Sequence, residues 1–145
     1  MNSRIYRIID ANLNRSREGL RVCEEITRFI LNDSKLTSRF KNYRHLLSHL
    51  SQNLPLTAEQ LLKSRDSRRD VGNYAFRPKK RKNEVREIFT ANIRRSEEAL
   101  RVLEEFSKTI NKKTAVDFQQ LRFKLYTLEQ RTLLKIISTE KAKEL

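Results

Sequence analysis

The fold is decided by residues 10–30, DANLNRSREGLRVCEEITRFI, which return as residues 90–110, TANIRRSEEALRVLEEFSKTI. Aligned without gaps, roughly half of the positions are identical, which is typical of an internal repeat. The identical pairs are Ala11/Ala91, Asn12/Asn92, Arg15/Arg95, Ser16/Ser96, Glu18/Glu98, Leu20/Leu100, Arg21/Arg101, Val22/Val102, Glu24/Glu104, Glu25/Glu105 and Ile30/Ile110. The chain is therefore interpreted as two copies of one structural unit.

A second, weaker sequence similarity follows each copy. NYRHLLSHL at 42–50 aligns with QLRFKLYTL at 120–128, which pairs Arg44 with Arg122. Each half then consists of a long helix, a short break and a second helix that returns along the first. Because such a hairpin cannot bury its own apolar stripe, two of them are expected to pack together. We expect an all-α antiparallel bundle with an internal pseudo-two-fold axis.

The expected organisation is one domain over residues 1–145. Repeat one covers about 4–53, a linker with a short helix covers 54–83, and repeat two covers about 84–137. The first helix should end at Asn32-Asp33-Ser34, and the second before Pro55. Thr57 and Gln60 have the spacing of a capping box, and Thr114 is the expected cap of the last long helix.

Composition limits the classes of function. The 145 residues carry 32 Lys and Arg against 18 Asp and Glu, so the formal charge is +14 and the pI is about 10.3. No apolar run approaches the ~18 residues of a membrane span, and the charged N-terminus is unlike a signal peptide. The single Cys excludes a disulfide framework within the chain and a cysteine-based zinc site. We expect a cytoplasmic protein, without membrane contact, whose partner is nucleic acid, an acidic protein or a phosphorylated small molecule.

Polar residues interrupt the apolar stripe of each long helix. At 100° per residue, Asn12 lies at its centre, with Arg15 and Ser16 to either side. The same arithmetic places Asn92 and Arg95 on the inner face of the second copy. An arginine turned toward a core is costly unless an anion meets it. Either each arginine pairs with a glutamate of the other repeat for structural reasons, or both arginines and both asparagines converge on an anionic ligand.

Two further groups of charged residues have alternative interpretations. Glu18, Arg21 and Glu25 are spaced as an intrahelical charge ladder, although Glu18 could instead orient Arg15 or hold magnesium. The segment 64–83 holds eight basic residues and two acidic ones, Asp66 and Asp70. It is either a solvated basic linker or a ligand-binding loop.

In the second case the acidic residues would coordinate a metal together with phosphate oxygens, and Gly72 would permit a turn that offers backbone N–H groups to a phosphate. No glycine-rich phosphate loop occurs, so arginine and lysine side chains, helix N-termini and metal ions would have to hold a nucleotide. Tyr43 and Tyr126 are expected to pack between helices rather than to stack on a base.

Four motifs in order carry a resemblance to a known family. RIIDANLNRSREGLRVCEEITRF, SRDSRRDVGN, the E-x-R at 84–86 leading to ANIRRSEEALRVLEEFSK, and LRFKLYTLE resemble the helical domain fused to the N-terminus of some thiamine phosphate synthases. That domain also occurs alone, as monofunctional hydroxymethylpyrimidine phosphate kinases. Since nothing barrel-sized follows residue 145, the chain resembles the stand-alone form.

The resemblance implies transfer of a phosphoryl group from ATP to hydroxymethylpyrimidine phosphate, with Mg²⁺, in thiamine biosynthesis. Under this hypothesis Arg15, Arg95 and Asp70 are catalytic. The expected phosphate or substrate ligands are Asn12, Asn92, Arg44, Arg122, Arg65, Arg68, Arg69 and Gly72. The expected magnesium ligands are Glu18, Asp66 and Asp70. Alternatives are a basic helical nucleic-acid-binding module, supported by the run 77–82, and an interaction partner of thiamine phosphate synthase. A homodimer is a further expectation.

Overall fold

The computed structural model describes residues 3–73 and 84–143, which form five α-helices and one π-helical turn and contain no strand. The elements are α1 (Ser3–Glu25), the π-helix η1 (Ile26–Ile30), α2 (Ser34–Gln52), α3 (Ala58–Ser64), α4 (Glu84–Ser107) and α5 (Lys112–Lys143). The expected all-α bundle of two long hairpins is confirmed. The basic run 77–82, and with it most of the second half of the expected linker, lies outside the described residues.

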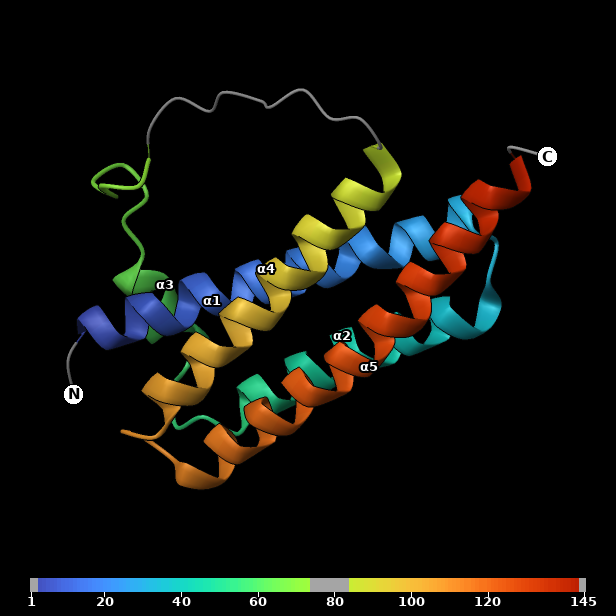
Figure 1. The fold of residues 1–145 in the computed structure, drawn as a ribbon. Coiled ribbons are helices and arrows are strands. Elements are labelled where there is room, and N and C mark those ends of the chain that lie inside the picture. The colour runs from blue at the N-terminus through green and yellow to red at the C-terminus, as the bar shows by residue number, and fades with distance from the viewer. Residues whose placement is uncertain (1–2, 74–83, 144–145) are drawn as a thin grey trace.

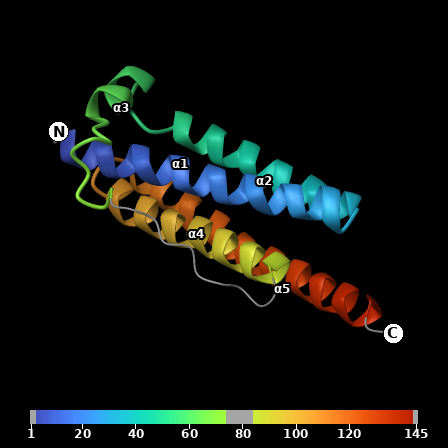
Figure 2. The same ribbon diagram turned by 90° about the horizontal axis from the view of Figure 1, so that it is seen from above.

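The long helices form two layers. α1 contacts α4 and α2, α4 contacts α5, and α2 contacts α5, while α3 packs on α1. Figures 1 and 2 show α1 and α4 together in one layer, with α2 and α5 in the other. We call the surface of α1 and α4 that is turned away from α2 and α5 the outer face; in Figure 1 it is the upper side.

The pseudo-two-fold axis passes through the contact of α1 with α4. Ser96 Oγ donates a 2.9 Å hydrogen bond to the carbonyl oxygen of Ser16, its equivalent in the other repeat. Further along, Cys23 Sγ lies 3.9 Å from the carbonyl oxygen of Phe89, so the two helices run antiparallel. A two-fold axis that exchanges antiparallel neighbours is perpendicular to both. Equivalent residues of α1 and α4 therefore lie on the same side of the pair.

The core fills the space between the layers. Phe40, Phe89 and Phe118 are fully buried together with Leu, Ile and Cys side chains from α1, α2, α4 and α5. The rings of Phe40 and Phe89 meet edge to face, with their centroids 6.1 Å apart. None of the described helices contains a stretch long and apolar enough to cross a membrane.

Local sequence accounts for most helix ends. Asp33 caps α2 by accepting a hydrogen bond from the Leu36 N–H, and the capping box of Thr57 and Gln60 is present at α3, as predicted. The prediction for α5 was wrong by one turn. Asn111, not Thr114, is the cap, because Asn111 Oδ1 accepts the N–H of Thr114 at 3.1 Å. Thr114 is buried within the first turn of α5, which runs on to Lys143.

The first hairpin turn is longer than the second. The repeats align with an offset of 80 in the first helices and 78 in the second, so two extra residues lie in the turn of repeat one. The structure accommodates them in the wider turn η1 and in Asn32, which has a left-handed φ of 54°. The remainder of each hairpin keeps the same register.

Candidate functional site

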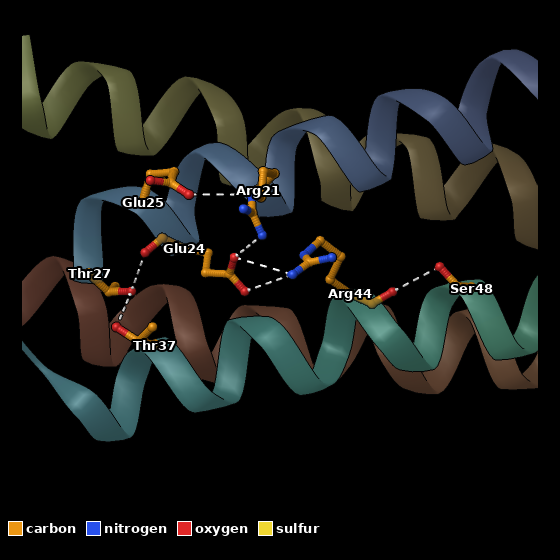
Figure 3. Close-up of polar contacts among 7 residues, drawn as sticks. All are labelled: Arg21, Glu24, Glu25, Thr27, Thr37, Arg44 and Ser48. Carbon is orange, nitrogen blue, oxygen red and sulfur yellow. Dashed lines mark hydrogen bonds and ion pairs between the residues drawn. The ribbon is translucent and has the colours of Figure 1, made fainter. Parts of the chain in front are cut away.

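Both hairpins enclose a buried ion pair between their helices. In repeat one, Glu24 of α1 bonds Arg44 of α2 at 3.2 Å and Arg21 at 2.7 Å (Figure 3). In repeat two, Glu104 is 3.1 Å from Arg122 and 3.4 Å from Arg101. These pairs occupy equivalent positions in the two copies.

The buried pairs give Arg44 and Arg122 a structural role. Both were expected to bind phosphate, yet each guanidinium faces a carboxylate of its own hairpin. Burial lowers the pKa of Arg122, but the hydrogen bonds with Tyr126 and Glu104 outweigh this and raise it above its ordinary value. Arg122 therefore stays charged and remains paired with Glu104. Of the expected intrahelical ladders, the Arg21–Glu25 and Arg101–Glu105 contacts form.

Arg15 and Arg95 do not point into the core. Both side chains are exposed, which corrects the expectation of inward arginines. The reason is the close approach of α1 to α4: Ser16, Gly19 and Ser96 fill the contact and leave no room for a long side chain. Arg15 and Arg95 each precede the paired serines by one residue. By the pseudo-symmetry they emerge near each other on the outer face.

The asparagines of the same motif are more deeply placed. Asn12 is buried and Asn92 half-buried, and each side-chain amide donates a 2.8 Å hydrogen bond to its own helix, at Ile8 O and Ile88 O. Asn12 Oδ1 also accepts a hydrogen bond from Arg15 Nη1 at 3.5 Å. This bond is long, so it orients Arg15 weakly and leaves the guanidinium available to a ligand.

A basic cavity of about 350 Å³ opens on the outer face beside α1. It brings together four residues that the sequence analysis had selected, and we call it the outer-face pocket. Those four are Asn12, Arg15, Arg69 and Asp70, and the pocket is completed by Arg4, Arg7, Ile8, Ala11 and Val71. Four arginines and one carboxylate in a partly open cavity are suited to an anion with several charged oxygens.

Arg4 and Arg7 were missed by sequence reasoning. The signal was present, because residues 4, 7, 11 and 15 share one face of a helix. Both arginines were overlooked because the repeat alignment begins at residue 10, after Arg4 and Arg7. Their equivalents in repeat two are Glu84 and Glu87. The charge is therefore reversed at these two positions, whereas Arg15 keeps its equivalent Arg95 in repeat two.

An ion pair holds the segment 65–73 over α1. Arg65 Nε and Nη2 bond both carboxylate oxygens of the buried Asp10, at 2.9 and 3.0 Å. This hydrogen bonding and the charge of Asp10 raise the pKa of Arg65. Arg7 Nη2 adds a 2.7 Å hydrogen bond to the carbonyl oxygen of Asp66. Arg65, expected to bind phosphate, is thus the tether that positions Arg69 and Asp70.

The remaining loop residues are placed as follows. Arg68 is exposed and does not line the outer-face pocket. The Gly72 N–H, expected to face a phosphate, donates to Asp70 Oδ1 at 2.8 Å. Asp66 accepts a hydrogen bond from the backbone N–H of Arg69 at 3.3 Å, and its carboxylate pairs with the Arg69 guanidinium at 3.8 Å.

The expected magnesium ligands do not gather into one group. Within residues 3–73 and 84–143, no three His, Cys, Asp or Glu side chains form a cluster that could hold a metal ion. Glu18 is exposed on α1, and only Asp70 of the three lines the outer-face pocket. A single carboxylate in an arginine-lined cavity fits Mg²⁺ that arrives with a phosphate, since Mg²⁺ commonly takes one or two carboxylates and completes its shell with phosphate oxygens and water.

A duplicated helical hairpin that carries an arginine-lined pocket on its outer face defines the class: a small all-α domain built from two repeats. The chain belongs to the ThiD2 family, whose model matches residues 7–131.

Curated relatives connect the domain to thiamine biosynthesis. The chain is 40% identical over 126 residues to the thiamine-phosphate synthase of Nostoc punctiforme, a match that covers 86% of this chain and 34% of the relative. It is likewise 40% identical over 126 residues to that of Synechocystis sp., covering 86% and 35%. The thiamine-phosphate synthase of Rhodopirellula baltica is 37% identical over 133 residues, covering 91% and 35%. The chain therefore spans about a third of the length of these relatives. No solved structure matches it significantly.

Proposed function

We propose that the chain is a kinase that transfers the γ-phosphoryl group of ATP to hydroxymethylpyrimidine phosphate and so forms the diphosphate used in thiamine biosynthesis. The observation that supports this is the outer-face pocket, in which Arg4, Arg7, Arg15 and Arg69 surround a space large enough for a polyphosphate. The family resemblance and the thiamine-phosphate synthase relatives support the pathway.

The chemistry asks for charge neutralisation more than for a base. An oxygen of the acceptor phosphate bonds to the γ-phosphorus, the bond from that phosphorus to the bridging oxygen breaks, and ADP leaves with the electron pair. A phosphate monoester has a second pKa of about 6, so most of it is already dianionic at neutral pH. The main barrier is the repulsion between two polyanions, which preorganised arginines reduce.

In this mechanism Arg15 grips phosphate oxygens from α1, and Arg69 covers them from the tethered segment. Arg95, on the same face across the pseudo-two-fold axis, takes a phosphate of the second ligand. Asp70 would hold Mg²⁺, which supplies charge compensation to the phosphate oxygens when it is bound. Asn12 lines the same pocket and accepts only a weak 3.5 Å hydrogen bond from Arg15, so the guanidinium can turn toward a phosphate.

The test is a coupled ADP-release assay with hydroxymethylpyrimidine phosphate as acceptor. Arg15→Ala and Arg95→Ala should each lower kcat/KM by about 10- to 100-fold, since each removes a charged contact to the transferring group. Arg39→Ala is the matched control, because Arg39 is an exposed arginine of α2, in the other layer. If Arg15→Ala and Arg95→Ala both keep the wild-type kcat/KM, the outer face takes no part in the mechanism.

A nucleic-acid-binding module remains the alternative on grounds of charge alone. The net charge of +14 supports it, and the basic run that motivated it lies outside the described residues. Filter binding to RNA over a salt series separates the two functions. Tight binding that falls steeply with salt, without ADP release, would favour the alternative.

A further inference from the structure

A second cavity lies on the flank of repeat two, between α4 and α5. It has a volume of about 290 Å³ and is lined by Arg94, Glu97, Glu98, Arg101, Arg122 and Tyr126. We call it the flank pocket. It is separate from the outer-face pocket, because the two share no lining residue. Nothing in the mechanism above uses it.

One wall of the flank pocket is an aromatic ring held in a fixed orientation. The Tyr126 hydroxyl accepts a 2.9 Å hydrogen bond from Arg122 Nη1, and the Arg122 guanidinium carbon lies 5.7 Å from the centroid of the Tyr126 ring. Arg122 is itself fixed by Glu104. Tyr126 nevertheless remains 40% exposed, whereas the sequence predicted that it would pack between helices. A preoriented, accessible ring beside arginines is the usual platform for a nucleic base.

The two repeats differ at this wall. At the offset of 78, Tyr126 corresponds to Ser48 and Phe123 to His45, and on the long helices Arg94 corresponds to Asn14. The scaffold beneath them is retained, since Arg21 with Arg44 matches Arg101 with Arg122. The aromatic wall is therefore specific to repeat two, just as Arg4 and Arg7 of the outer-face pocket are specific to repeat one. Two unlike cavities on two copies suit an enzyme with two unlike ligand groups.

The charge of the flank pocket is also favourable to a phosphorylated ligand. Glu97 is only 6% exposed and lies within hydrogen-bonding reach of Glu129, and Glu97 Oε2 has no donor among the described residues. Burial and the neighbouring Glu129 raise the pKa of Glu97 to about 8. At neutral pH the Glu97 carboxyl is therefore mostly protonated and contributes little negative charge. Arg94 and Arg101 then face a wall that repels anions less strongly.

We propose that the flank pocket binds the planar heteroaromatic base of a phosphorylated ligand, with the Tyr126 ring stacked on the base. The ligand class rests on the proposed function, which supplies two such bases, the adenine of ATP and the pyrimidine of the acceptor. The base–ring stack is the same chemistry for both, so the experiment decides which of them occupies the pocket.

The sharpest probe is tryptophan fluorescence, because the chain contains no Trp. In Tyr126→Trp the new indole should stack on the base and be quenched by ATP or by hydroxymethylpyrimidine phosphate, whichever binds there. Tripolyphosphate, which has no base, should leave the emission unchanged. Phe29→Trp is the control: Phe29 is exposed in η1 of repeat one and lines neither the flank pocket nor the outer-face pocket, so the emission of this indole should respond to none of the three.

Calorimetry gives the second measurement. Tyr126→Ala should weaken the base-bearing ligand about 10-fold or more, as expected for loss of one stacked ring, and should bind tripolyphosphate as the wild type does. Tyr126→Phe should stay within about threefold of wild type, because the ring remains. Wild-type affinity of Tyr126→Ala for both base-bearing ligands, or an equal loss for tripolyphosphate, would overturn the proposal.

The outcomes for the two proposals are distinct. Base-dependent quenching without ADP release refutes the kinase and leaves the stacking site. ADP release with an unchanged KM for both substrates in Tyr126→Ala refutes the stacking site and leaves the kinase.

Discussion

Gly19 lies so close to Ser96 that a β-carbon on the glycine would stand 2.2 Å from Ser96 Oγ and 2.6 Å from the carbonyl oxygen of Asn92. The serine hydroxyl can rotate away, but the Asn92 oxygen belongs to the backbone of α4. The contact of the two long helices thus depends on the missing side chain. It also explains why the arginines beside this contact must turn outward.

Gly19→Ala should therefore destabilise the protein, although alanine is the better helix former by about 1 kcal/mol. Overpacking of a tight helix contact costs about 1–3 kcal/mol, and here the backbone must move. Urea unfolding measures the difference. The matched variant is Ala99→Gly at the equivalent position of repeat two, where the side chain is buried and its loss should also destabilise. A Gly19→Ala protein more stable than wild type would contradict the packing described.

Glu104→Ala should be among the most damaging single changes in repeat two. It leaves Arg122, only 9% exposed, without its carboxylate, and breaking such a buried pair costs about 3–5 kcal/mol. Arg101→Ala removes the other partner of Glu104, but this arginine is 57% exposed and should cost less than about 1 kcal/mol. Chemical denaturation of both variants provides the comparison. Equal losses would show that the interhelical pair is no more important than the surface one.

Asp10→Asn should weaken ligand binding in the outer-face pocket without touching a lining residue. The change removes the charge that holds Arg65, so the segment carrying Arg69 and Asp70 is less well positioned. We expect the Kd for ATP to rise about 3- to 10-fold, as for partial loss of a charge-assisted contact. Glu59→Gln is the control, because Glu59 pairs with Lys63 on the exposed surface of α3. If both variants bind ATP like the wild type, the tether does not position the pocket.

Glu97→Gln should change how stability depends on pH. The pKa of Glu97 is raised from 4.5 to about 8 in the folded protein, so the folded state binds the proton more tightly than the unfolded state. The contribution of Glu97 to the free energy of unfolding is complete below about pH 4.5 and is lost as the pH rises toward 8. Above pH 8 the glutamine variant should melt a few degrees higher than wild type, by about 3 °C per kcal/mol for a chain of this size. At pH 5 the two should converge.

Thermal melts from pH 5 to pH 9 test this, with Glu59→Gln on the exposed surface of α3 as the control. Parallel curves for Glu97→Gln and wild type would mean that the pKa of Glu97 is not raised in the folded protein.

The sequence was sufficient to predict the architecture. Helix caps depend on residues that are neighbours in the chain, and the internal repeat is found by aligning the chain with itself. The duplication at Arg15/Arg95 predicted two equivalent hairpins, and the pair Thr57 and Gln60 predicted the start of α3, both as found. The start of α5 was misplaced because Asn111 and Thr114 are both good caps. Which of them is used depends on the burial of Thr114 in the tertiary structure.

Side-chain direction could not be read from helical angles alone. Arg15 lies near the edge of the apolar stripe, and only the close contact at Gly19 decides that it faces outward. Arg44 and Arg122 seemed available for phosphate because their carboxylate partners lie about 20 residues away on another helix. The flank pocket was hidden for the same reason, since its walls come from two helices and its features differ between the repeats.

The pairing of Ser16 with Ser96 has a consequence for the origin of the chain. Because each half meets the other through its own counterpart, a single ancestral hairpin could have assembled with an identical copy by the same surface, as isologous dimers do. Once two copies are linked in one polypeptide, each half can diverge separately, since a linked pair need not stay symmetric. If the present chain is cut between residues 73 and 84 and the two pieces are mixed, they should associate as a heterodimer.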